Sequence, residues 1–142
     1  MQIKDVMSRD VVLTHPDAAL IEAARKMREQ DVGMLPIGED KRLIGTITDR
    51  DIIVRAVADG IDPREGTVRQ AMSKGLVYCY DDQPLEEASA LMSQHQVRRL
   101  PVIGRDRRLV GIVALGDLAR SGEDQATDEA SAALAGVSAQ PH

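Results

Sequence analysis

The sequence predicts an α/β fold in which one β-α-β-β-α unit occurs twice, with the two copies paired about a pseudo-twofold axis. The first supporting observation is a repeat of motifs along the chain. Val6-Met7-Ser8 returns as Ala71-Met72-Ser73, and Leu35-Pro36-Ile37 returns as Leu100-Pro101-Val102. Two copies are too few to bury the faces of an open solenoid, so we expect them to face each other. Such pairing creates clefts, which are the usual binding places of small ligands.

The second observation is that each copy has the same order of expected elements. Apolar residues at the spacing i, i+3, i+4 and i+7 predict a helix over 18–30 in one copy and over 84–94 in the other. A short extended segment precedes each helix, at 11–14 and at 76–79. Two apolar strands joined by a charged turn follow each helix, and the expected strands are 34–37 with 43–47 and 100–103 with 109–113. A second helix is expected to begin near Asp49 and near Leu115.

These elements divide the chain into four parts. We expect repeat 1 over 1–60, a polar and turn-rich linker over 61–67, repeat 2 over 68–120, and an acidic tail rich in Ala and Ser over 121–142. Residues 68–72 are expected to form a helical turn. The tail has no aromatic residue and no sustained apolar period, and this composition favours disorder.

Composition limits the class of function. The 142 residues include no Phe, no Trp and only two Tyr, which argues against base stacking on aromatic side chains. The formal net charge is −5, and four of the acids lie in the tail, so the body is nearly neutral and does not favour nucleic acid. No long apolar run and no signal-peptide pattern occur, which predicts a cytoplasmic protein without a membrane partner.

Cys79 is the only cysteine in the sequence. We expect it to be a buried strand residue, with a reactive thiol as the alternative.

The sharpest local motif is Thr48 followed three residues later by Asp51, at the point where a strand gives way to a helix. One interpretation is a capping box, in which the hydroxyl and the carboxylate satisfy the first helical amides. The other is a binding site, because a carboxylate accepts hydrogen bonds from a ribose diol. The two interpretations are compatible. Copy two keeps the acid, as Asp117, but has Ala114 in place of the threonine.

A second motif is the adjacent pair Arg98 and Arg99 ahead of a predicted strand. Arginine matches phosphate oxygens with two parallel hydrogen bonds, so the pair is a candidate phosphate contact. The alternative is a solvated approach to the strand. Copy one has Gly33 and Met34 at these positions and offers no positive charge.

No motif indicates catalysis or a metal site. The chain has no P-loop, no dinucleotide fingerprint and no nucleophile motif, and its three histidines are scattered. We therefore expect neither an enzyme nor a protein that requires a metal or another cofactor.

Taken together, the repeated Met-Ser start, the Val-x-x-Leu-Pro strand and the Leu-Ile/Val-Gly…Asp ending resemble a pair of CBS domains, known as a Bateman module. The resemblance covers about residues 3–120. Among members, the chain looks most similar to small stand-alone bacterial CBS pairs, including the hypoxic-response type, which suggests a role in stress response. Members often form dimers, so the resemblance also implies a homodimer.

The resemblance implies clefts that bind adenosine-containing ligands: AMP, ADP, ATP, NAD or S-adenosylmethionine. It assigns the ribose to Thr48 and Asp51, and the phosphates to Arg98 and Arg99. The residues that it places around adenine are Thr14, Met34, Leu35 and Pro36. Ala114 departs from the family pattern, so the second cleft, around Asp117, is expected to be degraded.

Two functions follow as hypotheses. The first is a regulatory module that senses an adenine nucleotide in the cleft between the repeats and signals through its conformation or assembly to a protein partner of unknown identity. The alternative is an interaction scaffold whose clefts hold no nucleotide. Substitution of Asp51 separates them, and the capping interpretation by itself predicts a folding cost of about 1 kcal/mol or less.

Overall fold

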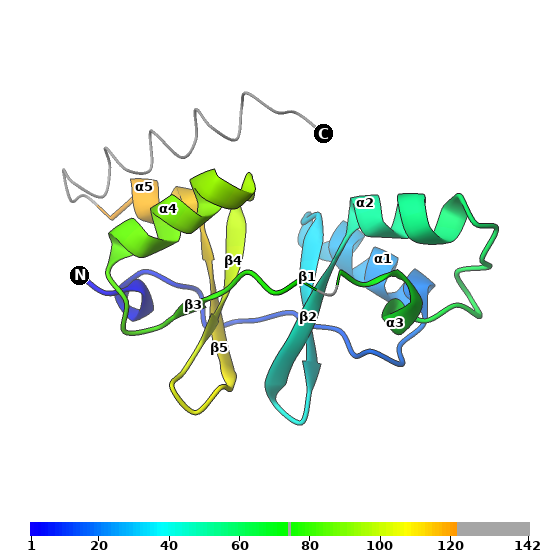
Figure 1. Cartoon of the computed structure of the whole chain (residues 1–142), viewed down its shortest axis with the longest axis horizontal. Helices are drawn as coiled ribbons and strands as arrows, with labels where there is room; N and C mark the ends of the chain where they lie inside the picture. Colours follow the sequence, from blue (N-terminus) through cyan, green and yellow to red (C-terminus); the bar gives the residue numbers. More distant parts are fainter. Residues whose placement is uncertain (74, 122–142) are drawn as a thin grey trace. The chain divides into compact units, whose positions relative to one another are not determined.

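The computed structural model describes residues 1–73 and 75–121, and these form two compact units (Figure 1). Unit 2 is the continuous segment Val12–Leu76. Unit 1 combines Met1–Val11 with the described residues from Val77 onward. Each unit contains a small sheet and its own helices, so the mixed α/β architecture is confirmed.

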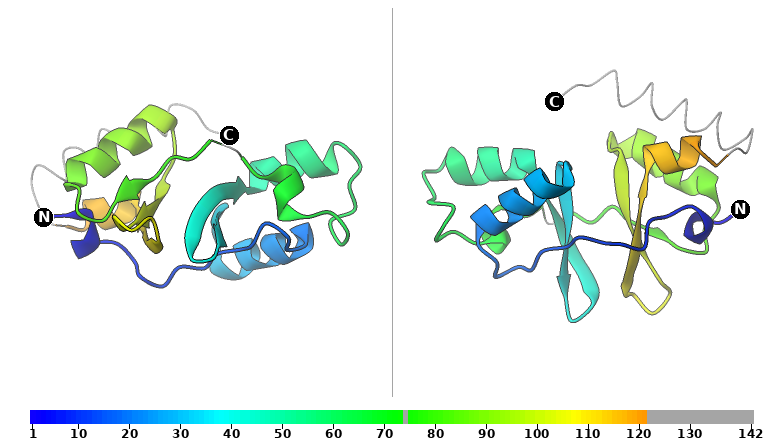
Figure 2. Two further views of the ribbon diagram at one scale, coloured as in Figure 1. Left: turned by 60° about the horizontal axis from the view of Figure 1, so that its bottom comes forward. Right: turned by 180° about the vertical axis from the view of Figure 1, so that it is seen from behind.

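Unit 2 is built on an antiparallel hairpin of β1 (Met34–Glu39) and β2 (Arg42–Thr48). Helix α1 (Leu20–Gln30) precedes the hairpin and α2 (Asp49–Ile52) follows it directly. A π-helical segment, η2 (Ile53–Val57), continues α2, and the short helix α3 (Val68–Ala71) completes the unit. In Figure 2, right panel, α1 lies beside the hairpin, at an angle to its strands.

Unit 1 repeats this plan with one more strand. Its sheet has the order β3-β4-β5, from β3 (Cys79–Tyr80), β4 (Arg99–Ile103) and β5 (Leu109–Ala114). Helix α4 (Leu85–His95) lies between β3 and β4, and α5 (Leu115–Ala119) follows β5. The N-terminal 3-10 turn η1 (Ile3–Asp5) belongs to this unit, because the Ile3 amide donates to the Gln83 carbonyl at 2.9 Å. Figure 1 shows α4 and α5 on one side of the sheet.

Apart from the first extended segment of each copy, the helices and strands agree with the sequence predictions to within two residues at each end. The segment expected at 76–79 is a strand only over Cys79–Tyr80, and the segment expected at 11–14 of copy one forms no named strand. There, Thr14 makes a single parallel bridge to Ile37, whereas the corresponding Cys79 begins a short strand, β3. In both copies this segment pairs alongside the strand that follows the first helix.

The compact units change over at Val11 and Leu76, whereas the predicted repeats are divided at residues 60 and 68, and those repeat bounds stay a prediction. The Met-Ser segment that opens each copy packs on the last strand of the other copy. Ser8, at the start of copy one, lies against β5, and Ser73, at the start of copy two, lies against β2. Ser8 exchanges two backbone hydrogen bonds with Ile112, of 2.8 and 2.9 Å, and thereby joins residues 1–11 to unit 1. The Ser73 amide donates to the Thr46 carbonyl at 3.0 Å, which joins the start of copy two to unit 2.

The predicted linker, 61–67, is part of the packing of unit 2. The Leu20 amide donates to the Gly66 carbonyl at 2.9 Å, and Ile61 packs against the core. The predicted tail, 121–142, lies outside the described residues apart from Ser121.

Each unit has its own aliphatic core. In unit 2 the apolar faces of α1 and the hairpin meet, and the fully buried members include Leu20, Leu35, Ile37 and Ile47. In unit 1 the corresponding members include Leu85, Met92, Leu100 and Val113. The spacing of these residues along helix and strand is the reason that each copy folds into the same unit.

Candidate functional site

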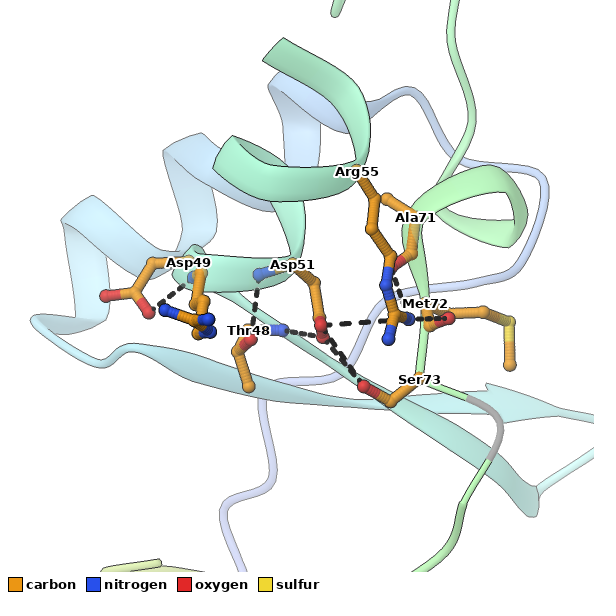
Figure 3. A network of polar contacts seen from close by, with 8 residues as sticks. Thr48, Asp49, Asp51, Arg55, Ala71, Met72 and Ser73 are labelled. Atoms are coloured by element: carbon orange, nitrogen blue, oxygen red, sulfur yellow. Dashed lines mark hydrogen bonds and ion pairs between the residues drawn. The ribbon is translucent and has the colours of Figure 1, made fainter. Parts of the chain in front are cut away.

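The candidate site lies at the start of α2, where Thr48 ends β2 (Figure 3). The Asp51 amide donates to Thr48 Oγ1 at 3.0 Å, and the Thr48 amide donates to Asp51 Oδ2 at 2.9 Å. These reciprocal bonds form the capping box that the sequence predicted. The box fixes the Asp51 carboxylate at the end of the strand, and it leaves acceptor positions on both carboxylate oxygens.

Two further side chains hold the same carboxylate. The Ser73 hydroxyl lies 3.2 Å from Asp51 Oδ1 and 3.1 Å from Asp51 Oδ2. An Arg55 guanidinium nitrogen lies 3.8 Å from Asp51 Oδ1. Asp51 is only 8% exposed, so its charge depends on these donors for stabilisation. Figure 3 shows the carboxylate between the helix that carries it and the segment that carries Ser73.

Neither Ser73 nor Arg55 was expected at this site from the sequence. Ser73 was visible only as part of the Met-Ser repeat, and nothing in that motif shows that the chain returns to the start of α2. Arg55 stands four residues after Asp51, a spacing that places two side chains on the same face of a helix. That spacing was the available signal for Arg55.

The predicted adenine-lining residues lie together in unit 2. The Thr14 amide donates to the Pro36 carbonyl at 3.0 Å, and Met34 stands opposite Thr48 in the hairpin register. Leu35 is 1% exposed and belongs to the core. The Thr14 hydroxyl is buried and has no hydrogen-bond partner within the described chain. Their assignment to adenine stays a prediction.

The corresponding position in unit 1 is organised differently. Asp117 accepts from the Ala114 amide at 2.8 Å, which is the half of the capping box that survives without the threonine. Its other oxygen accepts from an Arg120 guanidinium nitrogen at 2.7 Å. Capping and this ion pair explain why the acid persists in copy two, so its persistence is not evidence for ligand binding.

Arg98 and Arg99 also lie in unit 1, exposed at the start of β4. The Leu115 amide donates to the Arg98 carbonyl at 2.8 Å, and Arg99 stands opposite Ala114 in the register. Both side chains are therefore carried by rigid backbone near the start of α5. Their predicted contact with phosphates stays a prediction.

The two tyrosines belong to a surface cluster that no sequence motif indicated. Their rings meet edge to face at 5.7 Å, and the Arg105 guanidinium lies 4.0 Å above the Tyr80 ring. Arg105 also donates two hydrogen bonds to Asp82, both of 2.9 Å, and this lowers the pKa of the Asp82 carboxyl below its usual value. The cluster ties the β4–β5 turn to the end of β3.

Cys79 is a buried strand residue, as expected, and burial raises the pKa of its thiol to about 12. Because only the thiolate reacts, we expect the native protein to resist a thiol reagent such as DTNB at pH 8. The denatured protein should react completely, since its thiol has an ordinary pKa. Rapid labelling of the native protein would show that β3 opens readily.

The described residues offer no group of three or more His, Cys, Asp or Glu side chains able to hold a metal ion. Among the same residues, no helix has the length and apolar character needed to cross a membrane.

The chain was compared with known families, proteins and structures. The model of the CBS domain matches residues 3–57 and 68–124. The chain is 42% identical over 138 residues to the CBS domain-containing protein YhcV of Bacillus subtilis, covering 97% of this chain and 96% of YhcV. It is also 42% identical over 118 residues to Hypoxic response protein 1 of Mycobacterium tuberculosis, covering 82% of each.

Two solved structures are informative. The crystal structure of Hypoxic Response Protein I, with two coordinated zinc ions, superposes with a TM-score of 0.79 at 40% identity, covering 87% of this chain and all of that one. The CBS domain pair of protein MJ0100, in complex with 5′-methylthioadenosine and S-adenosylmethionine, gives a TM-score of 0.72 at 28% identity, covering 84% and 94%. The predicted resemblance is confirmed: with both copies matched by the family model and nearly its whole length shared with such relatives, the chain belongs to the CBS domain family.

Proposed function

We propose that the protein is a non-catalytic regulatory module that binds an adenosine-containing ligand at Thr48 and Asp51 and signals through its conformation or assembly. The observation that carries this proposal is the Asp51 carboxylate, held by a capping box at the end of a strand and 8% exposed. The MJ0100 pair supports it, because both of its ligands contain adenosine. AMP, ADP, ATP and NAD share that group and remain candidates.

The local charge favours a ribose over a phosphate at this point. Asp49 and Asp51 both lie in the first turn of α2, and a phosphate would be repelled by two carboxylates. A ribose diol, in contrast, donates hydrogen bonds to a carboxylate. A phosphorylated ligand needs cations elsewhere, and Arg98 and Arg99 are our candidates for that role.

The direct test is a calorimetric titration of the whole chain with 5′-methylthioadenosine, S-adenosylmethionine, AMP, ADP, ATP and NAD. Saturable binding of at least one ligand is expected. Absence of binding by all six, from a folded protein, would reject the proposal and favour the scaffold.

The role of the arginines is tested with the double variant Arg98→Ala/Arg99→Ala. We expect the affinity for ATP to fall by roughly tenfold to a hundredfold, because two charge-assisted hydrogen bonds are lost. The affinity for 5′-methylthioadenosine, which has no phosphate, should stay unchanged. Arg9→Ala removes an exposed charge from the same unit and serves as the matched control. Equal losses for both ligands would contradict a phosphate contact.

We also propose that the protein is a cytoplasmic homodimer. Ile53, Val54 and Val57 are 61%, 48% and 59% exposed, and their spacing places them on one face of the α2–η2 helix. Exposed apolar side chains that are adjacent on one helix favour association. Ile53→Glu/Val57→Glu is therefore expected to convert a dimer into a folded monomer, as measured by light scattering. A variant that keeps the dimer mass would place the interface elsewhere.

The same apolar face is the observation that favours the alternative function, a scaffold with empty clefts. A scaffold predicts that the dimer persists while no nucleotide binds, so the titration and the mass measurement together distinguish the two functions.

A further inference from the structure

We infer that Ser73 and Arg55 are positioning residues that hold Asp51, and that a ribose diol binding at Asp51 replaces the Ser73 hydroxyl and thereby loosens residues 71–73 from the start of α2. This inference rests on the proposed function, since it states how ligand binding at Asp51 would change the contacts of residues 71–73. The contacts that support it all lie within unit 2 (Figure 3).

The first step concerns the edge of the carboxylate that Ser73 occupies. Its hydroxyl oxygen is nearly equidistant from the two Asp51 oxygens, at 3.2 and 3.1 Å, so it lies across the edge that both oxygens share. A diol that donates one hydrogen bond to each oxygen needs that same edge. The Thr48 amide already occupies another position on Oδ2. Ligand and Ser73 therefore compete for one place.

The second step concerns what else holds the segment. Arg55 donates to the Met72 carbonyl at 2.9 Å and to the Ala71 carbonyl at 3.5 Å, and the same nitrogen lies 3.8 Å from Asp51. Arg55 thus bridges the carboxylate and the end of α3. A change at Asp51 alters two contacts of the segment, one through the Ser73 hydroxyl and one through Arg55, while the Ser73 amide keeps its hydrogen bond to the Thr46 carbonyl.

The third step concerns where the segment leads. Unit 2 ends at Leu76, and the chain then enters unit 1 at Val77. Residues 71–73 therefore lie close to one of the two points at which the chain passes between the units, the other being at Val11–Val12. Loosening of this segment would link ligand binding at Asp51 to unit 1 through the chain itself.

Unit 1 provides an internal comparison. Ser8 corresponds to Ser73 and makes the same kind of backbone pairing, with Ile112. The acid of that unit, Asp117, is bonded to Arg120 and to the Ala114 amide instead. The contact between the serine and the acid is thus a property of unit 2, and Ser8→Ala is a matched control for Ser73→Ala.

The first experiment needs no ligand. The chain is unfolded with urea as wild type, Asp51→Ala, Ser73→Ala and the double variant, and the coupling between the two sites is calculated. We expect a coupling of roughly tenfold in the unfolding equilibrium constant, because a charge-assisted hydrogen bond is shared by the pair. The cycle with Ser8→Ala in place of Ser73→Ala should show less than about twofold coupling. Equal coupling in both cycles would overturn the inference.

The second experiment uses 5′-methylthioadenosine, which carries the diol. Ser73→Ala should bind it about fivefold more tightly than wild type, since a hydrogen bond of ordinary net value no longer has to be broken. In wild type, the ligand should accelerate hydrogen exchange at residues 71–73. The analogue 2′,3′-dideoxyadenosine, which lacks the diol, should not accelerate it.

The outcomes separate the inference from the proposed function. Weaker ligand binding by Ser73→Ala, or slower hydrogen exchange at 71–73 when the ligand binds, would indicate that Ser73 contacts the ligand. Either result would overturn the inference that the diol replaces the Ser73 hydroxyl. Failure of the wild type to bind any adenosine compound would overturn the proposed function, and with it the replacement of the Ser73 hydroxyl by a ligand. The urea cycle would then still decide whether Ser73 holds Asp51.

Discussion

Asp51→Ala is expected to lower the affinity for adenosine-containing ligands by roughly tenfold to a hundredfold or more, because charge-assisted hydrogen bonds to a carboxylate contribute about 1.5–3 kcal/mol. Calorimetric titration with the ligand that wild type binds measures the loss. Asp117→Ala is the matched control, since this acid caps the corresponding helix of unit 1 and is paired with Arg120. An equal loss of affinity in both variants would contradict a specific contact between the ligand and Asp51.

The same variant should also destabilise the fold, by about 2–3 kcal/mol, since donors at a buried site lose their charged acceptor. This exceeds the 1 kcal/mol expected from a cap contact alone, because Ser73 and Arg55 also depend on the carboxylate. Asp51→Asn preserves the shape and one acceptor oxygen. It should lose less stability than Asp51→Ala while still binding more weakly than wild type, which separates the two effects.

Gly111→Ala is expected to destabilise the protein by about 1–3 kcal/mol or more, because the added methyl group meets atoms that cannot all move. A Cβ at Gly111 would lie 2.6 Å from Met7 Sδ and 2.8 Å from the Ser8 carbonyl oxygen. The second of these is a backbone atom that accepts a hydrogen bond of 2.9 Å from the Ile112 amide. Urea unfolding measures the cost.

Two other glycines calibrate this result. A Cβ at Gly45 would lie 2.5 Å from Met72 Cε but 3.2 Å from the nearest backbone atom, the Ser73 carbonyl oxygen, so Gly45→Ala should cost less than Gly111→Ala. Gly75 has nothing within 4 Å of an added Cβ, and its substitution should be neutral or slightly stabilising. If Gly111→Ala were neutral as well, residues 7–8 would not pack on β5 as described.

Much of the fold could be predicted because it depends on local periodicity. The apolar spacing of Leu20, Ala23 and Met27 specifies a helix with one buried face wherever it occurs. The charged turns fix the hairpins, and the Thr48–Asp51 spacing specifies a capping box through contacts only three residues apart. Recognition of the repeat then supplied the family.

The division into units could not be predicted in the same way. The chain order places Ser8 with copy one, but its backbone pairs with Ile112, more than a hundred residues later. A local pattern does not record which exposed strand edge a segment will find. The predicted boundaries therefore lie where the sequence repeat begins and ends. The compact units instead include whichever segment is hydrogen-bonded to their last strand.

In the candidate site, too, some residues could be predicted from local spacing and others could not. The two CBS repeats and the meeting of Thr48 with Asp51 at a helix start could be read from the chain, because they depend on motifs and short-range spacing. The contact of Ser73 with the Asp51 carboxylate, and the link from that carboxylate through Arg55 to the end of α3, required the three-dimensional fold. Such contacts arise when segments distant in the sequence are brought together by burial of their apolar neighbours, and no local pattern encodes them.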